Sequence, residues 1–479
     1  MAVKVLLAIL LCFFACESLV NARDPSERRG FRFTTEAQLC KLDKIRVRPP
    51  SRRIESEGGI TELWDEADEE FQCAGVGAIR NIIRPNSLSL PKFHNAPMLV
   101  YIEQGEAFFG MNYPGCAETY ESQSAQSSRS TRRMGRRIGA GRTEEDQHQK
   151  IRRVRRGDMI VIPAGTVQWC YNDGGEDLIA VAFLDLNNDD NQLDLRVRGS
   201  FLAGGVPSES RREIRGSKSE NLVNIFSGLD QEFLSEAYNI PSELVRRMQE
   251  ERSSGLIVKC DEEMSFLTPE EEEEELSETS FSRRRGEDSN GIEETVCTAR
   301  VQHNMNTQRE ADLFSREAGR VNILNQLKLP ILRFLGMSAE KGHLFANAQH
   351  NLHWSMTDHR MVYVVDGEAE IQISDDYGNQ VFNERVSRGN MFVIPQFYPA
   401  LARAGQEGFE WVTFKTSNQP MKSPVAGYTS FFRALPLQVL EQSFQITTAE
   451  AQQLKQTRRQ HTFLFPPTSG SSFSRSRRS

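Results

Sequence analysis

The sequence repeats itself in two places, and this repeat limits the possible folds more than any other feature. Residues 98–107 (MLVYIEQGEA) return as residues 361–369 (MVYVVDGEA), and residues 157–163 (GDMIVIP) return as residues 389–395 (GNMFVIP). Each segment is a short run of β-branched or apolar residues next to a glycine turn or a proline, which is typical of strands. Self-similarity at this distance indicates two copies of one structural unit.

A helical unit follows each copy of the strand motifs. Residues 224–240 parallel residues 430–446 at an offset of 206 positions, and both segments continue into a second helix. In the second copy Thr447 stands three residues before Glu450, which is a capping-box pattern. The sequence therefore predicts a mainly β protein with two β-barrels, each followed by a small helical unit.

Two polar segments interrupt this plan. The strand motifs are displaced by 262 and 232 positions, and the difference of 30 residues falls within residues 118–150, which are rich in Ser, Gln, Arg and Gly. We predict that this stretch is a disordered insertion in the first barrel. Residues 261–290 include six consecutive glutamates, whose mutual repulsion opposes packing, so we predict an exposed acidic linker between the two copies.

The N-terminus has the pattern of a secretory signal peptide. Lys4 precedes an apolar stretch from Val5 to Cys16 that is too short to span a bilayer comfortably, and small residues follow. We predict that residues 1–22 are removed by cleavage between Ala22 and Arg23. No later segment of the 479 residues is apolar enough to cross a membrane, and the net charge of −8 argues against nucleic acid as the main partner.

Six cysteines remain after the signal peptide: Cys40, Cys73, Cys116, Cys170, Cys260 and Cys297. An oxidising compartment favours disulfides among them, but six cysteines allow 15 complete pairings, so spacing leaves the connectivity open. No C-x-x-C pair and no cluster of histidines and cysteines with zinc-ligand spacing is present.

Several longer motifs resemble one family, the legumin-type (11S) globulins of seeds, which belong to the cupin superfamily. The motifs lie at residues 54–64 (IESEGGITELW), 84–91 (RPNSLSLP), 113–119 (YPGCAET), 290–298 (NGIEETVCT) and 423–430 (SPVAGYTS). Together they span nearly the whole mature chain in the order that the family has. The resemblance implies two cupin (jelly-roll) β-barrels and a seed storage protein, a nitrogen and amino-acid reserve that is mobilised at germination and has no catalytic activity.

The resemblance also implies how the chain is processed and assembled. An asparaginyl endopeptidase would cut between Asn290 and Gly291, separating an acidic chain with the N-terminal cupin domain (residues 23–260) from a basic chain (residues 291–479). The segment from Gly291 onward has a net charge of about +3 and the preceding part about −11, which fits such a division. The family forms a trimeric precursor and a mature hexamer, which reaches the protein storage vacuole through the endoplasmic reticulum.

The same resemblance assigns the cysteines. It implies a Cys116–Cys297 disulfide that joins the acidic and basic chains and a Cys40–Cys73 disulfide within the acidic chain, and it leaves Cys170 and Cys260 as thiols.

The alternative to storage is a cupin enzyme with a metal held by three histidines and a glutamate. Its motifs read G-x5-H-x-H-x3,4-E-x6-G and G-x5-P-x-G-x2-H-x3-N. Alignment on Gly105 places Met98, Pro91, Phe93 and Gln168 at the ligand positions, with His94 one residue away and therefore on the opposite face of the strand. Alignment on Gly367 places Arg360, Ser355, His353 and Ala400 there.

The sequence thus predicts no metal, no cofactor and no catalytic residue. We interpret His343, His350, His353 and His359 as a loop or strand-surface group, since their spacing matches no ligand pattern. A second alternative, a small hydrophobic ligand inside a barrel, stays open because apolar barrel interiors can contain pockets. Barrels filled by side chains such as Met98, Met361 and Phe392 would favour storage.

Overall fold

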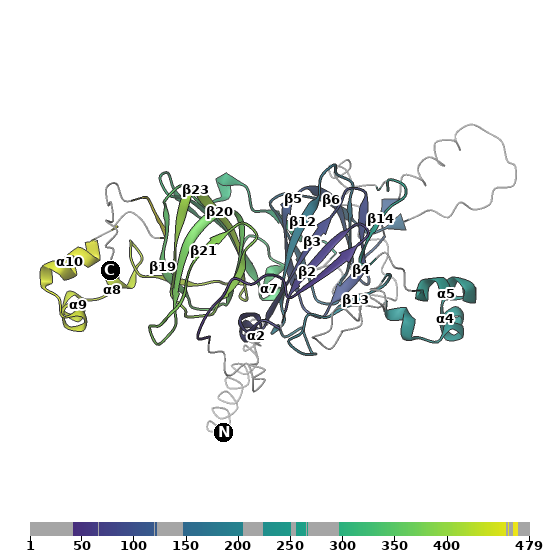
Figure 1. The fold of residues 1–479 in the computed structure, drawn as a ribbon, viewed down its shortest axis with the longest axis horizontal. Helices are drawn as coiled ribbons and strands as arrows, with labels where there is room; N and C mark the ends of the chain where they lie inside the picture. Colours follow the sequence, from purple (N-terminus) through teal and green to yellow (C-terminus); the bar gives the residue numbers. More distant parts are fainter. Residues whose placement is uncertain are drawn as a thin grey trace, which may run out of the picture.

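The computed structural model contains two β-barrels that lie side by side (Figure 1). It describes residues 42–65, 67–118, 120–121, 147–204, 224–250, 255–264, 266, 297–456, 458 and 463–467. Barrel one is built mainly from the N-terminal half of the chain and barrel two from the C-terminal half. The predicted pair of jelly-roll barrels is confirmed.

Barrel one has two sheets. The first runs in the order β1 (Arg52–Ser56), β2 (Gly59–Trp64), β3 (Val76–Ile83), β12 (Leu178–Asp185), β5 (Met98–Gln104), β10 (Asp158–Ile162) and β15 (Gln302–Asn304). The second runs in the order β13 (Gly199–Phe201), β4 (Ser87–His94), β11 (Val167–Asn172), β6 (Glu106–Asn112) and β9 (Ile151–Arg155), with β14 (Ile257–Lys259) also on β4. A hairpin of β7 (Tyr120–Glu121) and β8 (Gln147–His148) stands apart.

Barrel two is one continuous sheet. Its strands are β16 (Leu313–Ser315), β17 (Gly319–Leu324), β18 (Ser338–Leu344), β19 (Gln349–Ser355), β20 (Arg360–Ser374), β21 (Gln380–Ser387), β22 (Met391–Ile394), β23 (Ala400–Lys415), β24 (Lys422–Pro424) and β25 (Leu464–Phe465). The two long strands β20 and β23 pair with each other and hold β21, β22, β18 and β19 around them.

The sequence repeat gives the same backbone at matching positions of the two barrels. The first motif is a strand (β5 and the start of β20) followed by a glycine with positive φ, 81° at Gly105 and 71° at Gly367. The second motif forms β10 and β22, and 232 positions apart Gly165 and Phe397 share a φ near +70°. The two units therefore match in turn geometry even where the residue type has changed.

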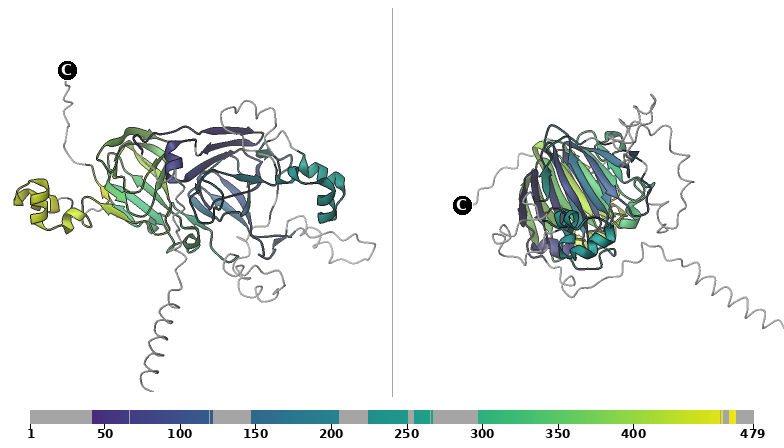
Figure 2. Two further views of the ribbon diagram at one scale, coloured as in Figure 1. Left: turned by 90° about the horizontal axis from the view of Figure 1, so that it is seen from below. Right: turned by 90° about the vertical axis from the view of Figure 1, so that its right-hand side faces the viewer.

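The predicted helical units are confirmed and project from opposite ends of the molecule (Figures 1 and 2). The first comprises η5 (Ile225–Gly228), α4 (Gln231–Tyr238) and α5 (Ser242–Gln249), and the second comprises α8 (Phe431–Ala434), α9 (Leu437–Phe444) and α10 (Thr448–Gln456). The capping box of α10 is present, because Glu450 N donates to Thr447 Oγ1 at 3.3 Å and Thr447 N donates to Glu450 Oε2 at 2.8 Å.

The two barrels share one apolar core where they meet. Phe183 of β12 stacks on Phe414 of β23 with ring centroids 5.5 Å apart, and the short helix α7 (Leu332–Leu335) adds buried leucines beside them. At the edge of this contact Tyr363 Oη donates to Glu103 Oε2 at 2.6 Å, and Arg388 Nη2 lies 3.0 Å from Glu103 Oε1. The core and these polar contacts hold the barrels together.

Each barrel also contains a segment from the half of the chain that mainly builds the other barrel. After Cys297 the chain adds β15 to the edge of β10 in barrel one, with Val161 N donating to Val301 O at 2.8 Å. Near the N-terminus Leu42 and Ile45 are buried in the core of barrel two, where Ile45 N donates to Val381 O at 2.9 Å. The domain boundaries predicted from the sequence stay a prediction, but packing crosses them in both directions.

The structure differs from the prediction at the ends of the two polar segments. Residues 118–150 were expected to be disordered, but β7 and β8 pair inside this range, so the insertion has an ordered base. The linker was expected to be exposed from Asp261, yet Phe266 packs on Trp169 and Phe108, with centroid distances of 5.2 and 5.5 Å. The remaining insertion, residues 122–146, and linker, residues 267–290, lie outside the described residues.

The described helices include none that combines the length and the apolar character needed to cross a membrane. The predicted signal peptide, with its cleavage site at Ala22 and Arg23, lies outside the described residues.

Candidate functional site

The inside of barrel one has a single histidine at the positions that hold a metal in cupin enzymes. Lys92, His94, Met98 and Gln168 line its cavity, and Gln168 Nε2 lies 3.2 Å from His94 Nδ1. We expected His94 to face outward, and this is wrong, because its side chain is 5% exposed inside the barrel. The motif allows three or four residues between its second histidine and its glutamate, and this chain has three between His94 and Met98.

The charged side chain that lines this cavity is a cation, Lys92. Lys92 Nζ donates to Ser89 Oγ at 3.0 Å, and no carboxylate lines the cavity among the described residues. Burial lowers the pKa of Lys92 to about 8, and burial together with the Lys92 ammonium lowers the pKa of His94 to about 3. An ammonium beside a single neutral imidazole does not provide the ligands of a transition metal.

Barrel two places an arginine where the enzyme motif has its glutamate. Arg360 Nη1 donates to His353 Nε2 at 2.8 Å, and Arg360 Nη2 donates to Tyr398 O at 3.0 Å. His353 Nδ1 in turn lies 2.8 Å from Asn351 O, so this nitrogen carries the proton. The imidazole lone pair that would bind a metal is therefore occupied by a guanidinium.

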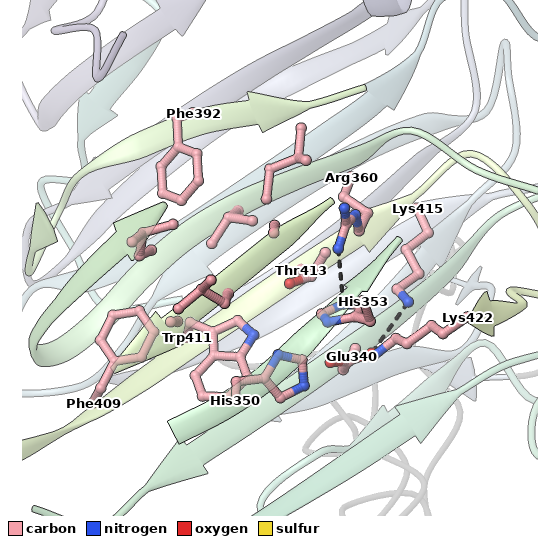
Figure 3. Close-up of a pocket in the computed structure, with 16 residues that line it drawn as sticks. Glu340, His350, His353, Arg360, Phe392, Phe409, Trp411, Thr413, Lys415 and Lys422 are labelled. Carbon is pink, nitrogen blue, oxygen red and sulfur yellow. Dashed lines mark hydrogen bonds and ion pairs between the residues drawn. The ribbon is translucent and has the colours of Figure 1, made fainter. Parts of the chain in front are cut away.

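Three strands bring further charges to the same interior (Figure 3). Lys415 Nζ lies 3.1 Å from Glu340 Oε2, and Lys422 Nζ forms a second ion pair with that oxygen. Burial would raise the pKa of Glu340, but the ammonium groups of Lys415 and Lys422 hold it well below its usual range. Burial lowers the pKa of Lys422 to about 8 against the opposing charge of Glu340.

The histidine group predicted for a loop or strand surface divides into two pairs, so that prediction is wrong in part. His350 and His353 are 7% and 3% exposed, and their rings meet inside barrel two with centroids 4.6 Å apart. Burial lowers the pKa of His350 to about 3. His343 and His359 are partly exposed, with His343 Nδ1 3.6 Å from Glu410 Oε2. Residues three apart in a regular strand face opposite sides, but the register shifts between His350 and His353 where β19 pairs with β23, and both side chains face inward.

Each barrel contains a small cavity of about 50 Å³. This volume has room for about four water-sized groups. Met98 lines the first cavity and Phe392 the second, whereas Met361 packs in the shared core. In the part of the chain that the structure describes, no group of three or more His, Cys, Asp or Glu side chains is placed to hold a metal ion.

The Cys116–Cys297 disulfide is present, with Cα atoms 5.5 Å apart. It joins the turn after β6 to the chain that leads into β15. Gln149 Nε2 steadies this turn by donating to Tyr113 O at 2.8 Å and to Cys116 O at 3.0 Å.

The other cysteines agree with the assignment as far as they are described. Cys73 is disulfide-bonded, while Cys40, its expected partner, lies outside the described residues, so that pairing stays a prediction. Cys170 and Cys260 are free thiols. The processing site at Asn290 and Gly291 also lies outside the described residues.

The sequence did not predict that Lys92, Glu340, Lys415 and Lys422 are buried charges. A weak signal was present, since Lys92 lies in a strand whose other polar residues alternate with apolar ones, and Lys415 follows a segment, residues 411–414, that is apolar except for Thr413. Nothing in the sequence, however, shows that residues 340, 415 and 422 meet.

Comparisons with known proteins agree on one group. The family model described as Cupin matches residues 45–211 and 303–452. The chain is 47% identical to 11S globulin seed storage protein 2 of Sesamum indicum, over 97% of this chain and 98% of that protein. It is 41% identical to 11S globulin seed storage protein Ana o 2.0101 of Anacardium occidentale, over 90% and 93% of the two chains. The crystal structure of procruciferin, an 11S globulin from Brassica napus, matches with a TM-score of 0.76 and 32% identity, over 90% and 99%.

Proposed function

Because the chain belongs to the 11S globulin seed storage proteins of the cupin family, we propose that it is stored as two disulfide-linked fragments in an oligomer. Storage is the function of the relatives, which are not enzymes. The observation that carries this function to the present chain is the 47% identity to the Sesamum indicum protein over nearly the full length of both chains.

Storage has a direct test in the plant. The protein should accumulate in maturing seeds and disappear during germination, as quantitative immunoblots of staged seeds would show. A level that stays constant through germination would contradict a reserve role. We propose that the predicted signal peptide, residues 1–22, directs the chain into the endoplasmic reticulum, from which it reaches the protein storage vacuole. Immunogold labelling of seed sections would test this location.

Processing after Asn290 is the second part of the proposal. The described contacts support it, because the Cys116–Cys297 disulfide would keep the two fragments covalently joined after a cut between Asn290 and Gly291. Incubation of the purified precursor with an asparaginyl endopeptidase should give a fragment that begins at Gly291. The fragments should separate in denaturing electrophoresis only after reduction. The Asn290→Gln variant should stay uncut, and cleavage of that variant elsewhere in the linker would contradict the assignment of the site.

Assembly through the two helical units is the third part. Both units expose large apolar side chains: Leu229, Phe233 and Tyr238 on the first, and Val439, Phe444 and Leu454 on the second. Because the units project from opposite ends of the molecule (Figure 1), contact between unlike ends would be heterologous, and such a contact builds a ring when its rotation closes. We infer that this contact builds the trimeric precursor, and that two trimers associate into a hexamer after the cut.

A single substitution tests the ring contact. Phe233 is 72% exposed, so Phe233→Asp should leave the fold intact and shift the precursor from trimer to monomer in sedimentation velocity. Phe314, which is 68% exposed on β16 and belongs to neither helical unit, is the matched control, and Phe314→Asp should remain trimeric. A trimeric Phe233→Asp variant would refute the contact.

A further inference from the structure

The interior of barrel two contains more positive than negative charge. Arg360, Lys415 and Lys422 line its cavity, and Glu340 is the carboxylate that lines it with them. Asp358 is a second buried carboxylate near Arg360, and it already accepts hydrogen bonds from Ser355 and Thr357. By formal charge, three cations face two carboxylates, which leaves one positive charge uncompensated in a place where every one of these side chains is less than a tenth exposed.

The neighbouring histidines do not change this balance. Burial lowers the pKa of His350 to about 3, and burial with the adjacent His350 and Arg360 lowers the pKa of His353 well below its usual range, so both rings are neutral. A buried charge without a counter-ion is unfavourable, because the protein interior does not replace the hydration that the charge loses on burial. The uncompensated positive charge therefore favours either the loss of a proton from one of the cations or the binding of an anion with a single negative charge.

Several polar atoms around the cavity are available to such an anion. Arg360 Nε and His350 Nε2 are buried and have no hydrogen-bond partner among the described residues. The ammonium groups of Lys415 and Lys422 share one acceptor, the oxygen Glu340 Oε2, in two ion pairs. Each ammonium has three N–H donors, so a second acceptor inside the cavity would use groups that the protein leaves unsatisfied.

The cavity also has an apolar side. Figure 3 shows Phe392, Phe409 and Trp411 on one side of the interior and the Arg360, Lys415 and Lys422 nitrogens on the other. Phe409 stacks on Trp411 with centroids 5.1 Å apart. An inorganic anion would contact only the cationic side, whereas a carboxylate with a short hydrocarbon tail would contact both.

We propose that barrel two binds one small monocarboxylate, with its carboxylate between Arg360, Lys415 and Lys422 and its hydrocarbon tail against Trp411 and Phe392. The cavity of about 50 Å³ limits the ligand to roughly four or five non-hydrogen atoms, the size of acetate or propionate. Arg360 stands where cupin enzymes have a glutamate, so the same position that attracts a metal cation in those enzymes attracts an anion here.

The test uses isothermal titration calorimetry of the purified full chain with sodium propionate at pH 7 and constant ionic strength, with 1-propanol as the uncharged control. We expect one site that depends on Lys422, and no heat of binding from propanol. Lys422→Met should weaken propionate binding at least tenfold, and Glu340→Gln should strengthen it at least tenfold because it removes the competing carboxylate. Lys92→Met, which changes the cation of barrel one, should leave this site unchanged.

The two opposite effects separate binding from structural damage. A loss of folding would weaken binding in both variants, and circular dichroism would detect it; if Lys422→Met fails to fold, the gain in Glu340→Gln still decides. Absence of propionate binding to the wild-type chain would refute the site, as would a change in the same direction in both variants. Equal binding of chloride would show that the cavity selects charge alone, which would overturn the carboxylate assignment.

Discussion

Removal of the Cys116–Cys297 disulfide by Cys297→Ser is expected to destabilise the uncut precursor strongly. The bond closes a loop of 181 residues, and it limits the conformations of the unfolded chain in proportion to the logarithm of this length. The chain-entropy relation gives about 5 kcal/mol for such a loop at 25 °C, and measured values are commonly somewhat smaller. We therefore expect a loss of about 3–5 kcal/mol in the free energy of unfolding.

Equilibrium unfolding in urea, followed by tryptophan fluorescence, measures this difference. Trp64 and Trp411 are buried in barrels one and two respectively, so the signal covers both halves. Cys170→Ser is the matched control, because it also removes a sulfur atom but breaks no disulfide, and it should lose less than about 1 kcal/mol.

Two results would refute the reasoning. A loss below about 1 kcal/mol in Cys297→Ser would show that the unfolded chain is not constrained by this bond. An equal loss in Cys170→Ser would show that the effect comes from packing of the sulfur atoms.

Three further predictions follow from other contacts. Burial lowers the pKa of His94 and His350 to about 3. Below about pH 6.5 these histidines therefore bind protons in the unfolded chain but not in the folded chain. The free energy of unfolding should fall between pH 6.5 and 3 by up to about 1.4 kcal/mol per pH unit for each histidine. His350→Asn should reduce the slope of stability against pH between 6 and 4, and an unchanged slope would contradict the shift. Gln445 ends α9 with a φ of 56°, whereas Asn, which tolerates positive φ better, occupies the matching position 239 after α4. Gln445→Asn should therefore stabilise α9 by about 0.5–1 kcal/mol and slow its amide exchange two- to fivefold. Faster amide exchange in this variant would contradict the prediction. Tyr363→Phe removes a hydrogen bond to the buried Glu103 carboxylate and should lower stability in urea by about 2 kcal/mol, while Tyr238→Phe on an exposed helix should change it by less than about 0.5 kcal/mol; equal effects would exclude the inter-barrel bond as the cause.

The architecture could be predicted from the sequence because its determinants are local. The repeated strand motifs, the glycines at positions 105 and 367 and the capping box at Thr447 each act within a few residues of chain. Such signals survive without knowledge of tertiary structure, and the structure places a strand, a positive φ or a helix start at each of them.

The inside of the barrels could be predicted only in part. The absence of the enzyme ligand set followed from Met98 and Arg360, which occupy the glutamate position in the two copies. The orientation of His94 did not follow, because a loop that is one residue shorter reverses which strand residues face inward. The meeting of Glu340, Lys415 and Lys422 depends on the pairing of β18 with β23 and of β19 with β24, which no local pattern specifies.

Each half of the chain contributes a segment to the barrel of the other half, and this exchange affects how a molecule behaves once it has been cut after Asn290. The basic fragment would still contribute the β15 edge strand to the N-terminal barrel, and the acidic fragment would still have Leu42 and Ile45 embedded in the C-terminal one. Each fragment thus packs into the barrel formed mainly by the other, so reduction of the disulfide in native buffer should leave the two fragments in one complex. Only the addition of a denaturant would let the fragments part.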